Sequence, residues 1–231
     1  MPANSASGTT GGDRDLAGVG ALVADRARCR MLVALADGRS LPAGRLAIEA
    51  DVSAATASSH LSKLVAGGLL MVDSVGRSRQ YRLAGPDVAD LLEALERLAP
   101  ALAVRSLEQS RQTRAWRQAR VCYDHVAGAL GVDILQVMLD RGHITPDRSR
   151  LTDEGSAFLT ELGVVVPASR QPVRHHADST EGRPHLSGAV GRGLLTRFVA
   201  LGWLERRPNQ RLHLTDDGRQ GFANQFSVEM E

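Results

Sequence analysis

The sequence predicts a mainly α-helical protein with small β-hairpins, an α+β fold in two domains. The first part of the chain contains several short segments with apolar residues at helical spacing. A glycine pair and two strand-like runs follow them. The second half contains a weak internal repeat, Val137–Gly155 and Val199–Gly218, in which each copy ends in Leu-Thr-Asp-x-Gly. We expect a disordered tail over residues 1–12, one domain over 13–110 and a second domain over 111–231.

The composition excludes several classes of protein. Of the 231 residues, 43% are hydrophobic, which is enough for a normal core, yet no run approaches the roughly 18 apolar residues of a membrane helix. The N-terminal stretch lacks the apolar segment of a secretion signal, and the two cysteines give no disulfide framework. We therefore expect a cytoplasmic protein. The net charge of +2 neither favours nor excludes a polyanionic partner.

Four short helices are predicted before the glycine pair. Leu16–Ala24 has apolar residues at helical spacing, and the aspartate at the start of Asp25–Ala36 can cap a clearer helix. Proline suits the first turn of the short helix Pro42–Ala50. The serine at the start of Ser53–Ala66 is a good N-cap, and Gly67-Gly68 stops that helix.

Two strand-like runs follow, Leu69–Asp73 and Gln80–Leu83, with a polar turn of hairpin length over residues 74–79. This order of elements is typical of a winged helix-turn-helix. The helix Ser53–Ala66, the second of the helix-turn-helix, has an apolar inner face. Its outer face carries short polar side chains that can reach base edges in the major groove of DNA. The hairpin adds arginines that suit phosphates. The expected DNA contacts are Ser53, Thr56, Ser58, Ser59, His60, Lys63, Arg77 and Arg79.

A long helix is predicted from Pro86 to about Gln109. Its leucines follow a 4-3-4 spacing, which makes a narrow apolar seam typical of paired helices. We expect a dimer interface there, with packing onto the helix's own domain as the alternative. The seam consists of Leu91, Leu95, Leu98 and Leu102.

The second half is predicted as two helix–hairpin–helix units joined by a loop over residues 166–184. In each copy of the repeat, Thr152 or Thr215 can cap the helix that follows the hairpin. Four arginines at intervals of three residues precede the units. We interpret them as a solvated or salt-bridged helix face, with phosphate contact as the alternative: Arg111, Arg114, Arg117 and Arg120.

The helix Ser53–Ala66, called the reading helix below, and the hairpin after it follow the pattern SxxTxSxHLxxL, then GLL, then GRxRxYxL. In this pattern residues 15–110 resemble the ArsR/SmtB family of bacterial winged-helix repressors. The resemblance implies a homodimer joined by the first and last helices of this domain, a palindromic operator in double-stranded DNA, and release by a small effector. A winged-helix module that binds protein without DNA is the alternative function.

Neither of that family's usual metal sites is present. The helix before the reading helix has no cysteine, and Asp87–Gln109 has no histidine. Cys122 and His125 lie three residues apart, which we interpret as one face of a helix. A metal or thiol-reactive sensor, a small organic effector and a purely structural tail therefore stay open, with a transition metal ion as the candidate cofactor. The candidate ligands are Cys122, His125, His175, His176 and His185.

Two further patterns bear on function. Longer ArsR-like regulators usually carry Cys-x-Asp-Trp before Arg-Pro-His, whereas residues 176–179 here read His-Ala-Asp-Ser. The resemblance therefore supports no ligand role at that place. No P-loop, GxSxG, HExxH or GxGxxG motif stands on a suitable element, so we do not expect an enzyme.

Overall fold

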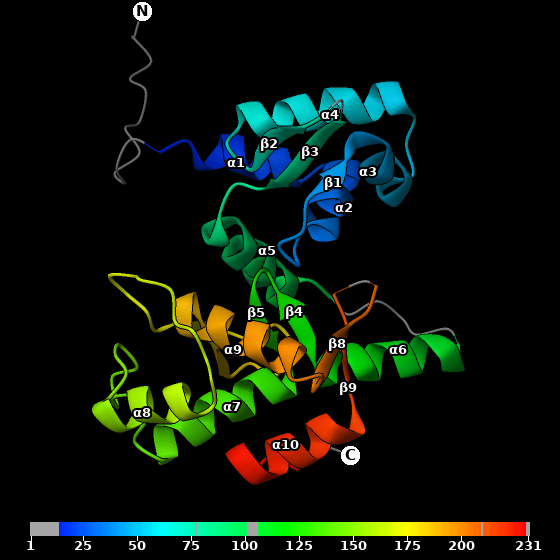
Figure 1. Cartoon of the computed structure of the whole chain (residues 1–231). Helices are drawn as coiled ribbons and strands as arrows, with labels where there is room; N and C mark the ends of the chain where they lie inside the picture. The colour runs from blue at the N-terminus through cyan, green and yellow to red at the C-terminus, as the bar shows by residue number, and fades with distance from the viewer. Residues whose placement is uncertain (1–13, 77, 101–105, 209, 230–231) are drawn as a thin grey trace, which may run out of the picture.

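The computed structural model describes residues 14–76, 78–100, 106–208 and 210–229. The tail expected over residues 1–12 lies outside the described residues. Two bodies of structure lie one above the other, with α5 between them (Figure 1). The elements of the N-terminal half are α1 (Leu16–Val23), α2 (Arg26–Ala34), β1 (Leu41–Pro42), α3 (Ala43–Ala50), α4 (Ala54–Ala66), β2 (Leu70–Val75), β3 (Ser78–Leu83) and α5 (Pro86–Leu98).

The winged helix-turn-helix is confirmed, with one added strand. Asp25 accepts a hydrogen bond from the backbone N–H of Arg28 at 2.9 Å, and Ser53 accepts one from that of Thr56 at 3.2 Å. These caps begin α2 and α4 where the sequence predicts. The unforeseen β1 pairs with β3, so that the sheet has the order β1-β3-β2. Strands β2 and β3 are also longer than predicted, which shortens the turn between them.

The single long helix predicted to Gln109 is wrong. Helix α5 ends at Leu98, and Ala99 is extended, with φ −74° and ψ 140°. Pro100 follows, and a proline ring clashes with a helical conformation in the residue before it. The proline therefore ends the helix within the predicted seam.

The leucine seam is left partly at the surface. Leu95 is 39% exposed and Leu98 is 83% exposed, whereas Leu91 is half-buried. The neighbouring Leu92 faces the core of its own domain. Leu102 lies outside the described residues. The dimer interface stays a prediction that the exposed leucines favour.

The C-terminal half consists of two copies of one unit, each a β-hairpin, a helix, a second strand pair and a second helix. In the first copy the second strand pair is reduced to a bridge between Ile144 and Leu151. The predicted helix–hairpin–helix units are therefore present, and each is preceded by a further hairpin. The elements are α6 (Leu107–Gln118), β4 (Arg120–Cys122), β5 (His125–Ala127), α7 (Ala129–Asp140), α8 (Asp153–Glu161), β6 (Arg174–Ala177), β7 (Pro184–Ser187), α9 (Gly188–Ala200), β8 (Leu204–Arg206), β9 (Leu212–Leu214) and α10 (Asp216–Phe226).

The loop predicted over residues 166–184 is wrong in part, because it contains β6 and the beginning of β7. The repeat is also longer than the sequence analysis recognised. The first copy enters its helix with HVAGALG from His125, and the second with HLSGAVG from His185. Gly128 and Gly188 open these helices with φ +80° and +73°, a conformation that favours glycine.

A second glycine in each copy lets the helix lie directly on the hairpins. A Cβ atom at Gly131 of α7 would overlap a carbonyl oxygen of β5 and would lie 3.4 Å from the Cβ atom of His185. A Cβ atom at Gly191 of α9 would lie 2.7 Å from a carbonyl oxygen of β7 and 3.0 Å from the Cβ atom of His125. Each helix therefore lies against the histidine of the other unit.

The Leu-Thr-Asp-x-Gly motif has a cap function in both copies. Thr152 and Thr215 accept hydrogen bonds from the backbone N–H groups of Gly155 and Gly218, at 3.0 and 2.9 Å. A Cβ atom at either glycine would overlap a backbone carbonyl oxygen. The predicted caps are confirmed.

Each half has an apolar core of its own. In the N-terminal half, Ala57, Leu61 and Leu64 of α4 are fully buried, as the predicted inner face requires. In the C-terminal half, both units contribute to one core around Phe198 and Phe222. Within the described ranges, no helix has both the length and the apolar character to cross a membrane.

We expect Gly131→Ala to destabilise the protein by about 1–3 kcal/mol, because α7 must then move away from β5. Thermal unfolding followed by circular dichroism measures the effect. Gly20→Ala in α1 is the matched control, since nothing lies within 4 Å of its Cβ position. The control should be neutral or stabilising. Equal effects of the two changes would contradict the close approach of α7.

Candidate functional site

The outer face of α4 presents short polar side chains to solvent. Thr56, Ser58, Ser59 and Lys63 are exposed, and so is the capping residue Ser53. The hydroxyl groups of Ser53 and Thr56 lie 2.9 Å apart, which fixes the first turn of the helix. Because the opposite face of α4 is buried in the core, this polar face is the one that can enter the major groove of DNA.

His60 is the exception, and its placement on the outer face is wrong. Its side chain is only 14% exposed and lies against α2. The ring Nδ1 is 3.4 Å from Nη1 of Arg28 and 3.8 Å from Oδ1 of Asp25. His60 therefore joins α4 to α2.

Within the described residues, the wing contributes an exposed cation. Arg79 is exposed on β3, with its guanidinium carbon 5.9 Å from the centre of the Tyr81 ring. Arg82 is paired with Asp73 across the hairpin at 2.9 Å. Arg77 lies outside the described residues. The predicted positive charge of this segment is therefore partly neutralised within the wing.

The sequence predicts that Cys122 and His125 share one face of a helix, and this is wrong. They face each other across the β4–β5 hairpin, and Tyr123-Asp124 forms the two-residue loop between them. Tyr123 has φ +57°, and such loops require a positive φ at their first central position. A spacing of three residues suits a helix face and a two-residue hairpin equally, so the spacing alone could not distinguish them.

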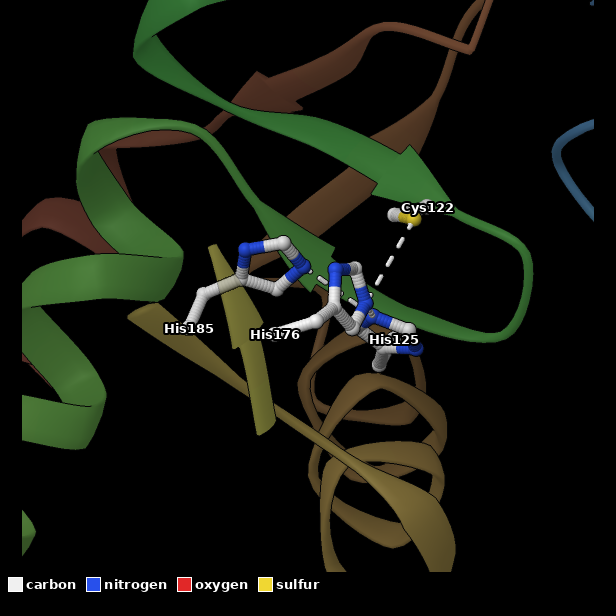
Figure 2. A group of neighbouring side chains, drawn as sticks. All are labelled: Cys122, His125, His176 and His185. Atoms are coloured by element: carbon white, nitrogen blue, oxygen red, sulfur yellow. Dashed lines mark hydrogen bonds between the residues drawn. The ribbon is translucent and has the colours of Figure 1, made fainter. Parts of the chain in front are cut away.

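The β6–β7 hairpin repeats this arrangement, with His176 directly opposite His185. Since β5 and β7 lie side by side, the two pairs form one cluster (Figure 2). His175 is exposed on the other side of β6, because successive strand residues point to opposite faces. Of the five candidate ligands, the structure brings together Cys122, His125, His176 and His185.

Three ring nitrogens of this Cys–His cluster meet at its centre. The Nε2 atom of His125 lies 3.1 Å from Nε2 of His176 and 3.1 Å from Nε2 of His185. The Sγ atom of Cys122 is 4.0 Å from Nε2 of His176. One ligand atom from each of the four residues lies within 4.8 Å of all the others.

The outer nitrogens of the three rings each face a carboxylate. For His176 and His185 the distances suit a hydrogen bond, although the angles fall short of one. None of these carboxylates was singled out as a site residue from the sequence. The pairs are His125 with Asp124 at 3.2 Å, His176 with Glu93 at 3.3 Å and His185 with Asp178 at 3.3 Å.

A buried ion-pair network supports these carboxylates. Nη2 of Arg120 donates to Glu93 at 2.8 Å and to Asp178 at 3.0 Å. Asp178 also accepts from the backbone N–H of Gly128 at 2.7 Å. Burial opposes ionisation of Asp178, but Arg120 and these hydrogen bonds outweigh it and lower the pKa of that carboxyl. Arg120 was predicted on a solvated or salt-bridged helix face. It is salt-bridged, but the helix is wrong, because Arg120 lies on β4 and is 2% exposed.

Glu93 comes from α5, in the N-terminal half. It follows Ala89 by four residues on the inner face of the helix, and a charged residue at such a position signals a buried partner. That signal was available in the sequence and was missed. The Sγ–H of Cys122 donates to the second oxygen of Glu93 at 2.8 Å.

Burial dominates the protonation of the Cys–His cluster. It lowers the pKa of His176 and lowers that of His185 further, and a charge on His125 would lower both again. Burial also raises the pKa of the Cys122 thiol, and the negative charge of Glu93 adds to this. The two rings are therefore neutral and the thiol protonated near pH 7.

Other contacts also join the halves, two of them as follows. The backbone N–H of Tyr123, at the tip of the β4–β5 hairpin, donates to the carbonyl of Ala36 beyond α2 at 2.6 Å. Arg97 of α5 donates to the carbonyl of Ala177 at 2.8 Å. The hairpins that carry the Cys–His cluster thus contact the N-terminal half just beyond α2 and on α5.

The chain is similar to proteins of known class. Residues 23–73 match a family described as a helix-turn-helix domain. The uncharacterised HTH-type transcriptional regulator YdfF of Bacillus subtilis is 35% identical over 223 residues, which cover 94% of this chain and 99% of YdfF. The HTH-type transcriptional regulator CmtR of Mycobacterium tuberculosis is 39% identical over 87 residues, which cover 38% of this chain and 73% of CmtR.

Among solved structures, the homodimeric winged helix-turn-helix DNA-binding domain of Mb0332 from Mycobacterium bovis is 32% identical. The alignment covers 36% of this chain and 76% of that domain, with a TM-score of 0.34.

We expect Arg120→Gln to cost about 3–5 kcal/mol of stability, because it leaves two buried carboxylates without their shared cation. Chemical denaturation measures this loss. Arg117→Gln is the matched control, since that side chain is 57% exposed and 3.9 Å from Glu181. An exposed pair contributes about 0–1 kcal/mol. A mild effect at Arg120 would show that the network does not hold the halves together.

Proposed function

Because this chain belongs to the family of HTH-type transcriptional regulators, we propose that it represses transcription as a homodimer that binds a palindromic operator and is released by an effector. The residue pattern by which residues 15–110 resemble the ArsR/SmtB family supports this role. The proposed role includes no enzymatic step.

The exposed face of α4 is the observation that carries the proposal. Hydroxyl side chains of Thr56 and Ser59 can donate to or accept from base edges. The capped N-terminus of the helix at Ser53 adds backbone N–H groups and a positive dipole end that suit a phosphate. A helix anchored on one face and polar on the other is the geometry that major-groove reading requires.

The wing supports contact with the DNA backbone. Arg79 is exposed on β3, and Lys63 is exposed on the reading helix. Cations at these positions neutralise phosphates, so affinity should fall as salt concentration rises. A module that binds only protein would lack this strong dependence on salt, which separates the alternative function from the proposed one.

A dimer would cover apolar surface that a single chain exposes. Leu16 on α1 is 79% exposed, and Leu95 and Leu98 on α5 are exposed as well. Large apolar side chains that gather on the first and last helices of the domain favour an interface between copies. Two reading helices related by a twofold axis would then meet half-sites about one DNA turn, roughly 34–36 Å, apart.

The C-terminal half is positioned to hold the effector. It contacts α5 and the end of α2, the elements on which the reading helix and the seam depend. A metal ion and a thiol-reactive compound would both have a site at Cys122. A cavity of about 250 Å³, lined by Cys29, Leu92 and Cys122 among others, would suit a small organic molecule.

We expect Ser59→Ala to weaken binding to the true operator by about 1–3 kcal/mol and to leave nonspecific binding unchanged. Fluorescence anisotropy with DNA from upstream of the protein's own gene measures both. Ser156→Ala on α8 is the matched control, because it removes the same hydroxyl from an exposed helix far along the chain. An equal loss on specific and random DNA would mean that α4 does not read bases.

We expect Arg79→Ala to weaken binding to all sequences and to reduce the slope of log affinity against log salt by about 1, since one phosphate contact is lost. The same titrations at several salt concentrations measure this. Wild-type binding that does not depend on salt would reject DNA as the ligand.

We expect Leu98→Glu to convert the dimer to a monomer, because a charge at an apolar interface is costly to bury. Light scattering after size exclusion measures the mass. Leu107→Glu on α6 is the control, since Leu107 is 82% exposed and lies beyond α5. The predicted seam is rejected if Leu98→Glu remains as dimeric as the wild type.

A further inference from the structure

The Cys–His cluster of Cys122, His125, His176 and His185 has ligand spacings close to those of a metal centre. Zinc bonds of about 2.0–2.1 Å to nitrogen and 2.3 Å to sulfur place tetrahedral ligand atoms about 3.3–3.8 Å apart. Two of the separations between ring nitrogens are 3.1 Å, one between sulfur and nitrogen is 4.0 Å, and all four ligand atoms lie within 4.8 Å of one another. Small movements of the side chains would bring these atoms to tetrahedral distances.

A carboxylate lies beside the Nδ1 atom of each ring. Asp124 is hydrogen-bonded to His125 at 3.2 Å, and Glu93 and Asp178 lie 3.3 Å from the Nδ1 atoms of His176 and His185. A negative charge beside Nδ1 favours a proton on that nitrogen. Each Nε2 atom then directs a lone pair toward the centre of the cluster. Histidines that bind metal are commonly held in this way, by a carboxylate on the outer nitrogen.

The Nε2 atoms meet in a buried site. Nε2 of His125 lies 3.1 Å from Nε2 of His176 and 3.1 Å from Nε2 of His185. A divalent cation at the centre would accept a lone pair from each ring.

Cys122 completes the donor set with a soft ligand. Its thiol is protonated in the structure and donates to Glu93 at 2.8 Å. Coordination would replace the S–H bond by a metal–sulfur bond and release one proton to solvent for each ion bound. The thiolate charge, with Glu93 beside it, would neutralise a divalent ion.

An ion has a route to the Cys–His cluster. A cavity of about 290 Å³ reaches His125. Its two aspartates, Asp90 and Asp124, are paired with Arg174 and Arg192, which line the same cavity. The cavity of about 250 Å³ described above reaches Cys122.

We propose that Cys122, His125, His176 and His185 bind one zinc-type divalent ion in a tetrahedral site at the junction of the two halves. One thiolate and three imidazoles suit Zn²⁺, and Co²⁺ takes the same geometry. Glu93, Asp124 and Asp178 position the rings.

The proposed function gives this site a further consequence. Glu93 belongs to α5 and accepts a hydrogen bond from Cys122, so coordination of Cys122 would remove a contact of the helix that carries the predicted dimer seam. Occupancy of the site would then change operator affinity, by an expected 5–150-fold typical of coupled sites.

The site is tested by titrating Co²⁺ into the full chain after chelation and under reducing conditions. We expect one ion per chain, the visible bands of tetrahedral Co²⁺ and a near-ultraviolet thiolate charge-transfer band. Cys122→Ser should remove the charge-transfer band, and Cys29→Ser should keep it. His176→Ala should abolish tight binding, while His175→Ala, one residue away on the exposed side of β6, should not.

The positioning role of the carboxylates has its own readout. Asp124→Asn should weaken Zn²⁺ binding by about 10–100-fold in a chelator competition and leave the Co²⁺ bands tetrahedral. The site is overturned if the wild type gives no thiolate band, if Cys29→Ser removes the band, or if His175→Ala and His176→Ala bind equally. The wild-type spectrum tests the proposed site even if a variant fails to fold.

The link to DNA is measured separately, by operator affinity with and without Zn²⁺ in the wild type and His176→Ala. We expect Zn²⁺ to change the affinity of the wild type alone. Equal affinities with a cobalt spectrum intact would overturn the effector role and leave the site standing. Absence of operator binding in every condition would instead reject the proposed function.

Discussion

The buried charge of Arg120 is the interaction on which the architecture depends. Its guanidinium lies between Glu93 and Asp178, which come from opposite halves of the molecule. Burial disfavours the charged form of a carboxylate, but the arginine helps to lower the pKa of Asp178. Glu93 and Asp178 lie 3.3 Å from the Nδ1 atoms of His176 and His185. One cation therefore holds the halves together and arranges the Cys–His cluster.

The reading helix depends on a different force. Helix α4 is held by the apolar contacts of Leu61 and Leu64, and no charge lies on its inner face. The apolar core is stabilised by the area that it buries, whereas the junction below α5 depends on the pairing of buried charges, and loss of one partner of such a pair is strongly destabilising. The two regions are therefore held by different interactions.

Sequence reasoning recovered the features that local chemistry determines. Caps such as Ser53 and Thr152 and the period of the α4 core residues act within a few residues, so the sequence carries them directly. It failed where a distant contact decides. The spacing of Cys122 and His125 fits two local structures, and only the neighbouring β7 selects the hairpin. Arg120 matches a repeating arginine pattern, but its partners are 27 and 58 residues away.

One error had a local cause. Pro100 disfavours a helical residue before it, and the leucine spacing was given more weight than the proline. The carboxylates of the Cys–His cluster were missed for another reason. Glu93 interrupts the apolar face of α5, and the matching heptapeptides HVAGALG and HLSGAVG would have paired His125 with His185.

That pairing has a consequence for how the C-terminal half came to be arranged. Each unit supplies one hairpin with two of the four clustered residues, and each lays its glycine-bearing helix over the hairpin of the other. A chain with a single unit could build the same centre only by associating with a second copy of itself. With both units in one chain, that association is covalently tethered, at fixed effective concentration. The two halves of the centre also differ, since a cysteine faces a histidine in one and two histidines face each other in the other.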